Sequence, residues 1–243
     1  MEAVRRQDYS RGLRLRRLVV TVRVKEPVSA ISHAIGALLA AAALVVLVAS
    51  SALHATPWHV VSFAVYGGCM VLVYLASAAY HWLPLKPSQE KLFRRIDHSM
   101  IYLMIAGSYT PIALVALRDV WGWTMLGLIW GIALYGIFNH WRPRPRGQQH
   151  TRHRRRSHAP TYIGMGWVAL VYLYPIVRVF SGPGVGWLVA GGVAYTVGGL
   201  IYALKRPNPL PGFVGFHEVF HLFVMLGSFC HFWFMLFHVL PLA

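Results

Sequence analysis

The chain has 243 residues, of which 57% are hydrophobic and 12% charged, and its formal net charge is +16. Soluble domains are usually about 45–50% apolar with about 25% charged residues, so the composition excludes an ordinary soluble domain and indicates a membrane protein. Most of the chain is too apolar to present the basic soluble surface of a nucleic-acid-binding protein, and no nucleic acid is expected as a partner.

A basic arm comes first in the chain. Residues 1–25 hold eight Lys and Arg residues, most of them between Ser10 and Lys25. Such a cluster is typical of a segment that sets membrane topology. Its partly apolar sequence also suits binding to an anionic lipid surface. We therefore interpret 1–25 as a basic cytoplasmic arm and 26–243 as a transmembrane domain.

Seven apolar segments follow the arm, each about as long as the roughly 20 residues that a helix needs to cross a bilayer. The segments cover about 28–50, 58–83, 96–117, 121–139, 161–180, 185–204 and 213–240. The sequence therefore predicts an all-α protein with seven transmembrane helices, integral to the cell membrane. Both cysteines, Cys69 and Cys230, fall inside these segments and are interpreted as small buried hydrophobic residues.

The basic residues alternate between the connections. Apart from Arg118 and Arg178, every Lys and Arg lies in the arm or after the second, fourth or sixth segment. Because Lys and Arg collect on the cytoplasmic side of a membrane, we expect a cytoplasmic N-terminus and a C-terminus outside. Only an odd number of spans permits this orientation, so the charges support seven spans independently of hydropathy.

Ionisable side chains inside a membrane are costly and are candidate functional groups. His81 lies at the end of the second span and Asp97 at the start of the third. His217 and His221 lie in the first two turns of the seventh. The predicted orientation brings all of them to the cytoplasmic end. His217 and His221 are four residues apart and share a helix face, and Ser77 has the same relation to His81.

Three neutral imidazoles with an open fourth position make a zinc site of the catalytic type. We therefore predict a site for zinc, or another late transition metal, held by His81, His217 and His221. Asp97 is then placed to act as a general base toward water. Ser77 is placed to hydrogen-bond the same water or a ligand.

Each of these residues also has a simpler interpretation. A membrane histidine can cap a carbonyl group or pair with an acid, and a serine in a helix usually bonds its own backbone. Asp97 can pair with Arg94 or Arg95. Glu26 and His33 share one face of the first span, where they can pair with each other or support the site.

The stretch HEVFH, residues 217–221, also matches the HExxH pattern of zinc proteases, in which the glutamate activates water. Zincins are soluble, however, and an intramembrane protease of this kind would be expected to draw a ligand from an Asp-Gly pair, which the chain lacks. Glu218 is therefore interpreted as incidental or supporting. His231 lies about 21 Å along the helix from His217 and is not expected to bind the same ion.

Four segments carry a family resemblance when they are taken together. They are EPVSAISHAIG (26–36), SAAYH (77–81), DHSMIYLMIAGSYTP (97–111) and HEVFHLFVMLGSFCH (217–231). From about Glu26 to its C-terminus the chain resembles the haemolysin III family, the bacterial branch of the progestin and adipoQ receptor superfamily, which is related to alkaline ceramidases. The resemblance implies seven helices, a cytoplasmic N-terminus and zinc held by the three histidines already named. It also implies that Ser77 and Asp97 flank the metal.

The favoured function is a metal-dependent hydrolase of a lipid amide or ester, as in the related ceramidases, with a membrane lipid as substrate. Zinc would polarise the carbonyl group of the lipid, Asp97 would act as general base, and Ser77 would stabilise the oxyanion by a hydrogen bond. Two alternatives stay open. One is a receptor-like or sensing protein in which zinc clamps helices together. The other is a cytolysin or pore-forming protein, although no polar stripe follows several spans. The oligomeric state is left open.

Overall fold

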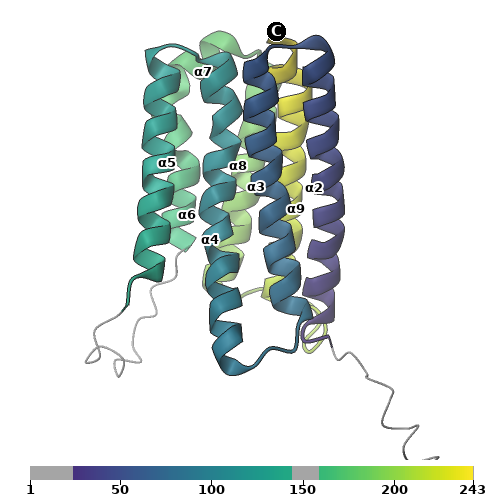
Figure 1. The fold of residues 1–243 in the computed structure, drawn as a ribbon. Helices are drawn as coiled ribbons and strands as arrows, with labels where there is room; N and C mark the ends of the chain where they lie inside the picture. Colours follow the sequence, from purple (N-terminus) through teal and green to yellow (C-terminus); the bar gives the residue numbers. More distant parts are fainter. Residues whose placement is uncertain (1–23, 144–158, 243) are drawn as a thin grey trace, which may run out of the picture.

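The computed structural model describes residues 24–143 and 159–242. The arm up to residue 23 and most of the Arg-rich connection after the fourth span lie outside the described residues, so lipid binding by the arm stays a prediction. In the described part, long helices stand side by side in one bundle (Figure 1). Cys69 and Cys230 are both free and buried within it, as predicted.

Each predicted span corresponds to one helical rod. The rods are α2 (Pro27–His54), α3 (Pro57–Trp82), α4 (Pro87–Pro111) with a π-helical end to Ala116, α5 (Val120–Trp141), α6 (Ala159–Gly166) joined to α7 (Leu173–Val179), α8 (Gly182–Leu204), and α9 (Phe216–Phe234) with further turns to Leu242. Over the described residues, seven helical stretches are long and apolar enough to cross a membrane. The predicted all-α fold with seven spans is confirmed.

The two sides of the helices differ as a lipid environment requires. Large aliphatic residues such as Leu38, Leu53 and Leu204 are exposed on the outside of the bundle. Phe63 and Met125 are fully buried inside it. Soluble proteins rarely expose apolar surface on this scale, whereas in a bilayer that surface contacts lipid chains. Together with the seven spans, this identifies an integral multi-pass membrane protein.

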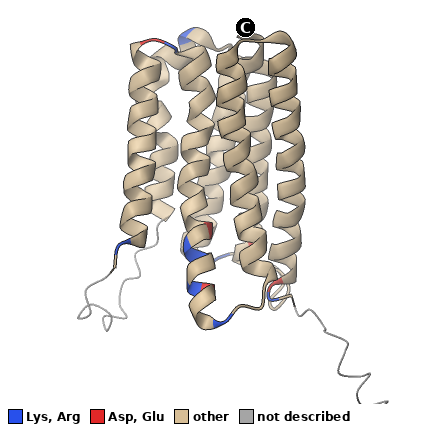
Figure 2. Cartoon of the chain, in the orientation of Figure 1, with Lys and Arg blue, Asp and Glu red and all other residues tan. Residues whose placement is uncertain are grey.

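One boundary differs from its prediction. The third rod begins at Pro87 rather than near residue 96. Proline is favoured in the first helical turn because its missing N–H has no helical partner there. The backbone N–H of Lys86 also donates to Oε1 of Gln89 at 3.2 Å, which stabilises the helix start. Hydropathy missed this segment because it is basic, and its charged residues mark the lower end of the bundle in Figure 2.

Close packing between α2 and α3 depends on Gly67. A Cβ atom there would lie 2.6 Å from Cδ1 and 3.0 Å from Cα of Leu44, whereas a Cβ at Gly68 would meet no atom within 4 Å. We expect Gly67→Ala to destabilise the fold by about 1–3 kcal/mol through overpacking. Gly68→Ala should be neutral or slightly stabilising, because alanine favours helix. Thermal unfolding of both variants in detergent tests this, and equal midpoints would contradict it.

Candidate metal centre

Three histidines from two helices meet near one end of the bundle. His81 lies in the last turn of α3, and His217 and His221 lie in the first two turns of α9. One ring nitrogen of each lies within 4.8 Å of the other two. His81 and His221 are each only 1% exposed. The structure thus brings together the three side chains that were predicted as metal ligands.

The spacing of the ring nitrogens suits a single ion. Two nitrogen ligands of a tetrahedral zinc, each about 2.0–2.1 Å from the metal, lie about 3.3 Å apart. The Nε2 atoms of His81 and His217 are 3.1 Å apart. His221 supplies the third imidazole, with one ring nitrogen within 4.8 Å of a ring nitrogen of each of the other two. Three imidazole nitrogens at this spacing are a donor set that fits zinc.

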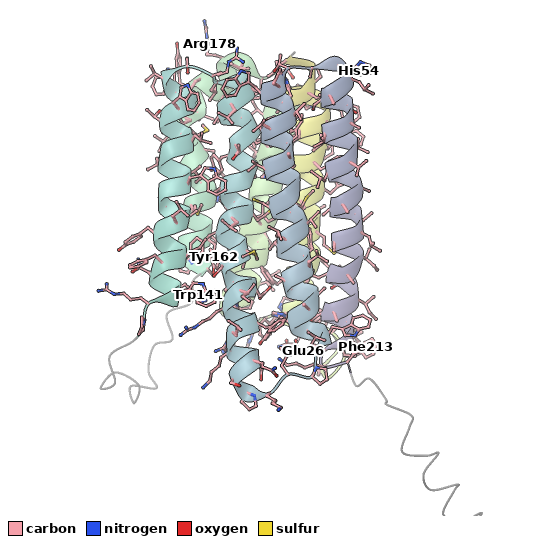
Figure 3. All side chains as sticks on the ribbon, in the orientation of Figure 1. Glu26, His54, Trp141, Tyr162, Arg178 and Phe213 are labelled. Carbon is pink, nitrogen blue, oxygen red and sulfur yellow. The ribbon has the colours of Figure 1, made fainter. Side chains whose placement is uncertain are left out.

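Glu26 orients the ring of His81. Its Oε2 accepts a hydrogen bond from Nδ1 of His81 at 2.5 Å, and its backbone N–H donates to the carbonyl oxygen of His81 at 3.1 Å. The ring proton is therefore assigned to Nδ1, which leaves the Nε2 lone pair directed toward His217. This hydrogen bond from His81 also holds the pKa of the Glu26 carboxyl below its ordinary value. Glu26 lies at the lower end of the bundle in Figure 3.

Lys25 fastens this region to α4. Its Nζ donates to Oε1 of Glu90 at 2.8 Å and lies 3.9 Å from Oε1 of Glu26. The same ammonium group lies 4.3 Å from the centre of the Tyr80 ring. The start of α2 is thus held against both α3 and α4 beside the histidines.

His33 packs against the histidine cluster and does not pair with Glu26. Its ring stacks on His221, with centroids 3.5 Å apart and planes 13° apart. The side chain is 4% exposed, and neither ring nitrogen has a hydrogen-bond partner in the described part of the chain. Of the two roles left open for His33 and Glu26, the structure favours support of the site over pairing with each other.

Glu218, the glutamate of HEVFH, is engaged with α2 and with its own helix start. Its Oε1 accepts a hydrogen bond from the Ser29 hydroxyl at 2.6 Å, and its Oε2 accepts one from the backbone N–H of Gly215 at 2.8 Å. It therefore caps α9 and joins α9 to α2. This arrangement gives Glu218 a supporting role in positioning the helix that carries two of the histidines.

Asp97 lies beside the histidines but outside the group of three. Its side chain is 15% exposed, with Oδ2 3.4 Å from Nδ1 of His98. Its negative charge is near enough to His33 and His217 to interact with both rings. Among the described residues it forms no ion pair with Arg94 or Arg95, so the simpler interpretation offered for it does not hold here.

Ser77 lies one turn before His81 and is buried. Unlike most serines in helices, it makes no hydrogen bond to its own backbone in the described structure, whereas Ser51 and Ser99 do. Its hydroxyl is therefore available to another partner. His231 lies elsewhere, with Nε2 donating to the carbonyl oxygen of Leu188 at 3.3 Å, and it is not part of the three-histidine group.

Comparison with known proteins places the chain in a family. Residues 21–232 match the family described as Haemolysin-III related. The chain belongs to the haemolysin III family. It is 40% identical over 226 residues to Hemolysin-3 of Bacillus cereus. This match covers 92% of this chain and 96% of the relative. It is 34% identical over 218 residues to the Hemolysin-3 homolog of Bacillus subtilis strain 168, covering 88% and 95% respectively.

The haemolysin III match extends over every residue of the candidate centre, from Glu26 to His221. The resemblance drawn from the four sequence segments is therefore confirmed at the level of the family. The names of the two Bacillus relatives state no metal and no reaction.

Proposed function

We propose that this haemolysin III protein is a zinc-dependent membrane hydrolase that acts on an amide or ester bond of a lipid. The observation that carries the proposal is the group of three imidazoles, of which His81 and His221 are buried and His217 is half-buried. Within the described residues, no fourth His, Cys, Asp or Glu belongs to that group. Catalytic zinc typically has three protein ligands and one open position, whereas structural zinc usually has four protein ligands.

In this proposal His81, His217 and His221 hold the ion, which supplies Lewis acidity toward a carbonyl group and makes water more acidic. Asp97 accepts a proton from the attacking water as general base. The Ser77 hydroxyl donates a hydrogen bond to the oxygen on which negative charge develops. Both groups are available for these roles, because Asp97 forms no ion pair with Arg94 or Arg95 and Ser77 forms no hydrogen bond to its own helix backbone in the described part of the chain.

Membrane lysis is the second candidate, and the names of the relatives favour it. A pore through one chain needs a polar lining. The described interior is instead filled by large apolar side chains such as Phe63, Met125 and Ile129. We therefore place hydrolysis ahead of pore formation by a single chain.

Metal analysis combined with a hydrolysis screen tests the proposal. The purified protein should contain about one zinc per chain, and it should hydrolyse at least one lipid from a panel of ceramides, other lipid amides and lipid esters. A chelator should abolish the activity, and added zinc should restore it. Stoichiometric zinc without hydrolysis across the panel would favour the sensing protein with a zinc clamp. Protein purified without bound metal, and unable to take it up, would overturn the proposal.

We further propose that the histidine end of the bundle faces the cytoplasm. The Lys and Arg residues of the described part gather mainly at that end (Figure 2). Arg178 lies at the opposite end (Figure 3), where it lines one cavity together with Arg118. Reporter fusions should place the N-terminus in the cytoplasm and the C-terminus outside. Fusions that place both ends on one side would contradict this orientation.

The Glu26–His81 pair leads to a prediction about affinity. A carboxylate bonded to a ligating histidine fixes its tautomer and raises its basicity, and loss of such a partner typically weakens metal binding about 10–100-fold. We expect Glu26→Gln to weaken zinc binding by this factor, measured by competition with a chromophoric chelator. Glu90→Gln is the matched control, since it removes the other carboxylate near Lys25. If zinc affinity fell equally in Glu26→Gln and Glu90→Gln, the loss would come from the disturbed contacts of Lys25 and not from the lost hydrogen bond to His81.

A further inference from the structure

The end of the bundle opposite the histidines contains a second candidate site. A cavity of about 520 Å³ lies between the end of the α4 rod, the start of α5 and α7. Its lining includes Arg118, Asp119, Trp121, Tyr174 and Arg178. Figure 3 shows Arg178 at the end of the bundle farthest from Glu26.

The two arginines of this cavity are not neutralised by a neighbour. Neither Arg118 nor Arg178 forms an ion pair with an acid of the described chain. The guanidinium group of Arg118 lies 5.3 Å from the centre of the Trp58 ring, and Trp58 in turn packs edge-on against Trp123. Stacking of this kind orients a guanidinium group without using its hydrogen-bond donors.

Among the described residues that line the cavity, Asp119 is the only acid, and its carboxylate is engaged by the start of α5. Oδ1 accepts hydrogen bonds from the backbone N–H groups of Trp121 at 2.8 Å and Gly122 at 3.4 Å. It thus caps the start of α5 and complements the positive end of that helix. The lining therefore keeps a positive formal charge, with two guanidinium groups against one carboxylate.

We propose that this cavity binds a phosphate group, supplied by the headgroup of an anionic phospholipid. Guanidinium groups match phosphate oxygens in charge and in the spacing of their donors. Trp121 and Tyr174 add the amphipathic rings that favour the boundary between headgroups and acyl chains. Val115 and Val179 give the same cavity apolar walls. The site is separate from the histidine centre and does not depend on the proposed reaction.

Binding to the full-length chain in a neutral maltoside detergent tests this site. Native mass spectrometry follows the fraction of protein with bound dihexanoylphosphatidylglycerol as its concentration rises. Dihexanoylglycerol, which has the same acyl chains and no phosphate, is the ligand control. Inorganic phosphate is added as a competitor to distinguish a lipid headgroup from free phosphate.

Four variants make the test specific. Arg118→Gln and Arg178→Gln should each weaken binding by roughly tenfold or more, since each removes charge-assisted hydrogen bonds. Asp119→Asn should strengthen binding, because asparagine still caps the helix while the repelling charge is gone. Lys91→Gln, which removes an exposed cation at the opposite end, should leave binding unchanged. If Arg118→Gln unfolds through the loss of its contact with Trp58, Arg178→Gln and Asp119→Asn still decide the matter.

Each outcome has a defined meaning. Displacement of the lipid by inorganic phosphate supports a phosphate site that free phosphate can also fill, and resistance to displacement supports a site for the whole headgroup. Equal binding of dihexanoylglycerol would overturn the proposal. So would equal weakening by Lys91→Gln, or unchanged binding after either arginine is replaced.

Discussion

His217→Ala should lose its zinc and unfold at a lower temperature than the parent protein. The three proposed ligands come from α3 and α9, helices far apart in the sequence, so metal binding energy there is also folding energy. At a free zinc concentration about 100 times the dissociation constant, a bound ion stabilises the folded state by about 2.7 kcal/mol. We expect the parent protein to show a zinc-dependent rise in thermal midpoint and the variant to show none.

His231→Ala is the matched control for this experiment. His231 lies on the same helix and is buried, but it bonds the backbone of Leu188 and lies outside the histidine group. Its replacement should lower the midpoint yet preserve both bound zinc and the zinc-dependent rise. If both variants keep zinc, or both lose it, the assignment of His217 as a ligand is wrong.

Asp97→Asn should behave differently from His217→Ala. Its zinc content should stay within severalfold of the parent value, while its turnover rate should fall by a factor of about 10²–10⁴. That range is typical for loss of a general base. Asn is nearly isosteric with Asp but cannot accept the proton, so the fold should be preserved. The measurement is the initial rate of hydrolysis of whichever lipid the screen identifies, alongside metal content.

Glu90→Gln, which removes a carboxylate from the same helix nearly two turns earlier, should keep the parent rate. Unchanged turnover in Asp97→Asn would show that Asp97 only braces the fold. Equal zinc loss in Asp97→Asn and His217→Ala, with no hydrolysis by the parent, would favour zinc as a clamp between helices.

Most of the architecture could be predicted because membrane spans leave a strong, local signal. An apolar run of sufficient length marks each rod, and the alternation of basic connections supports the number of rods independently. The exception, the start of α4 at Pro87, has a clear cause. Hydropathy reports which residues prefer lipid, whereas a helix can continue past the membrane surface when its start is capped.

The candidate centre was only partly predictable. The spacing of His217 and His221 places them on one helix face, and topology places His81 at the same end of the bundle. What the sequence does not encode locally is the rotation of each helix about its axis. That rotation turns Glu26 toward His81 and His33 toward His221, so the sequence alone does not decide the partners of these two residues. The position of Glu26 directly before Pro27, at the end of the bundle where α3 terminates, was the signal that could have suggested its partner.

The burial of both cysteines has a practical consequence. Thiol reagents attack exposed thiolates, and Cys69 and Cys230 are the only two cysteines of the chain and both lie inside the bundle. The native protein is therefore a suitable background for single-cysteine labelling without first removing its own thiols. Exposed serines at opposite ends of the bundle, Ser88 and Ser181, provide positions where a membrane-impermeant maleimide can report the two sides of the membrane separately.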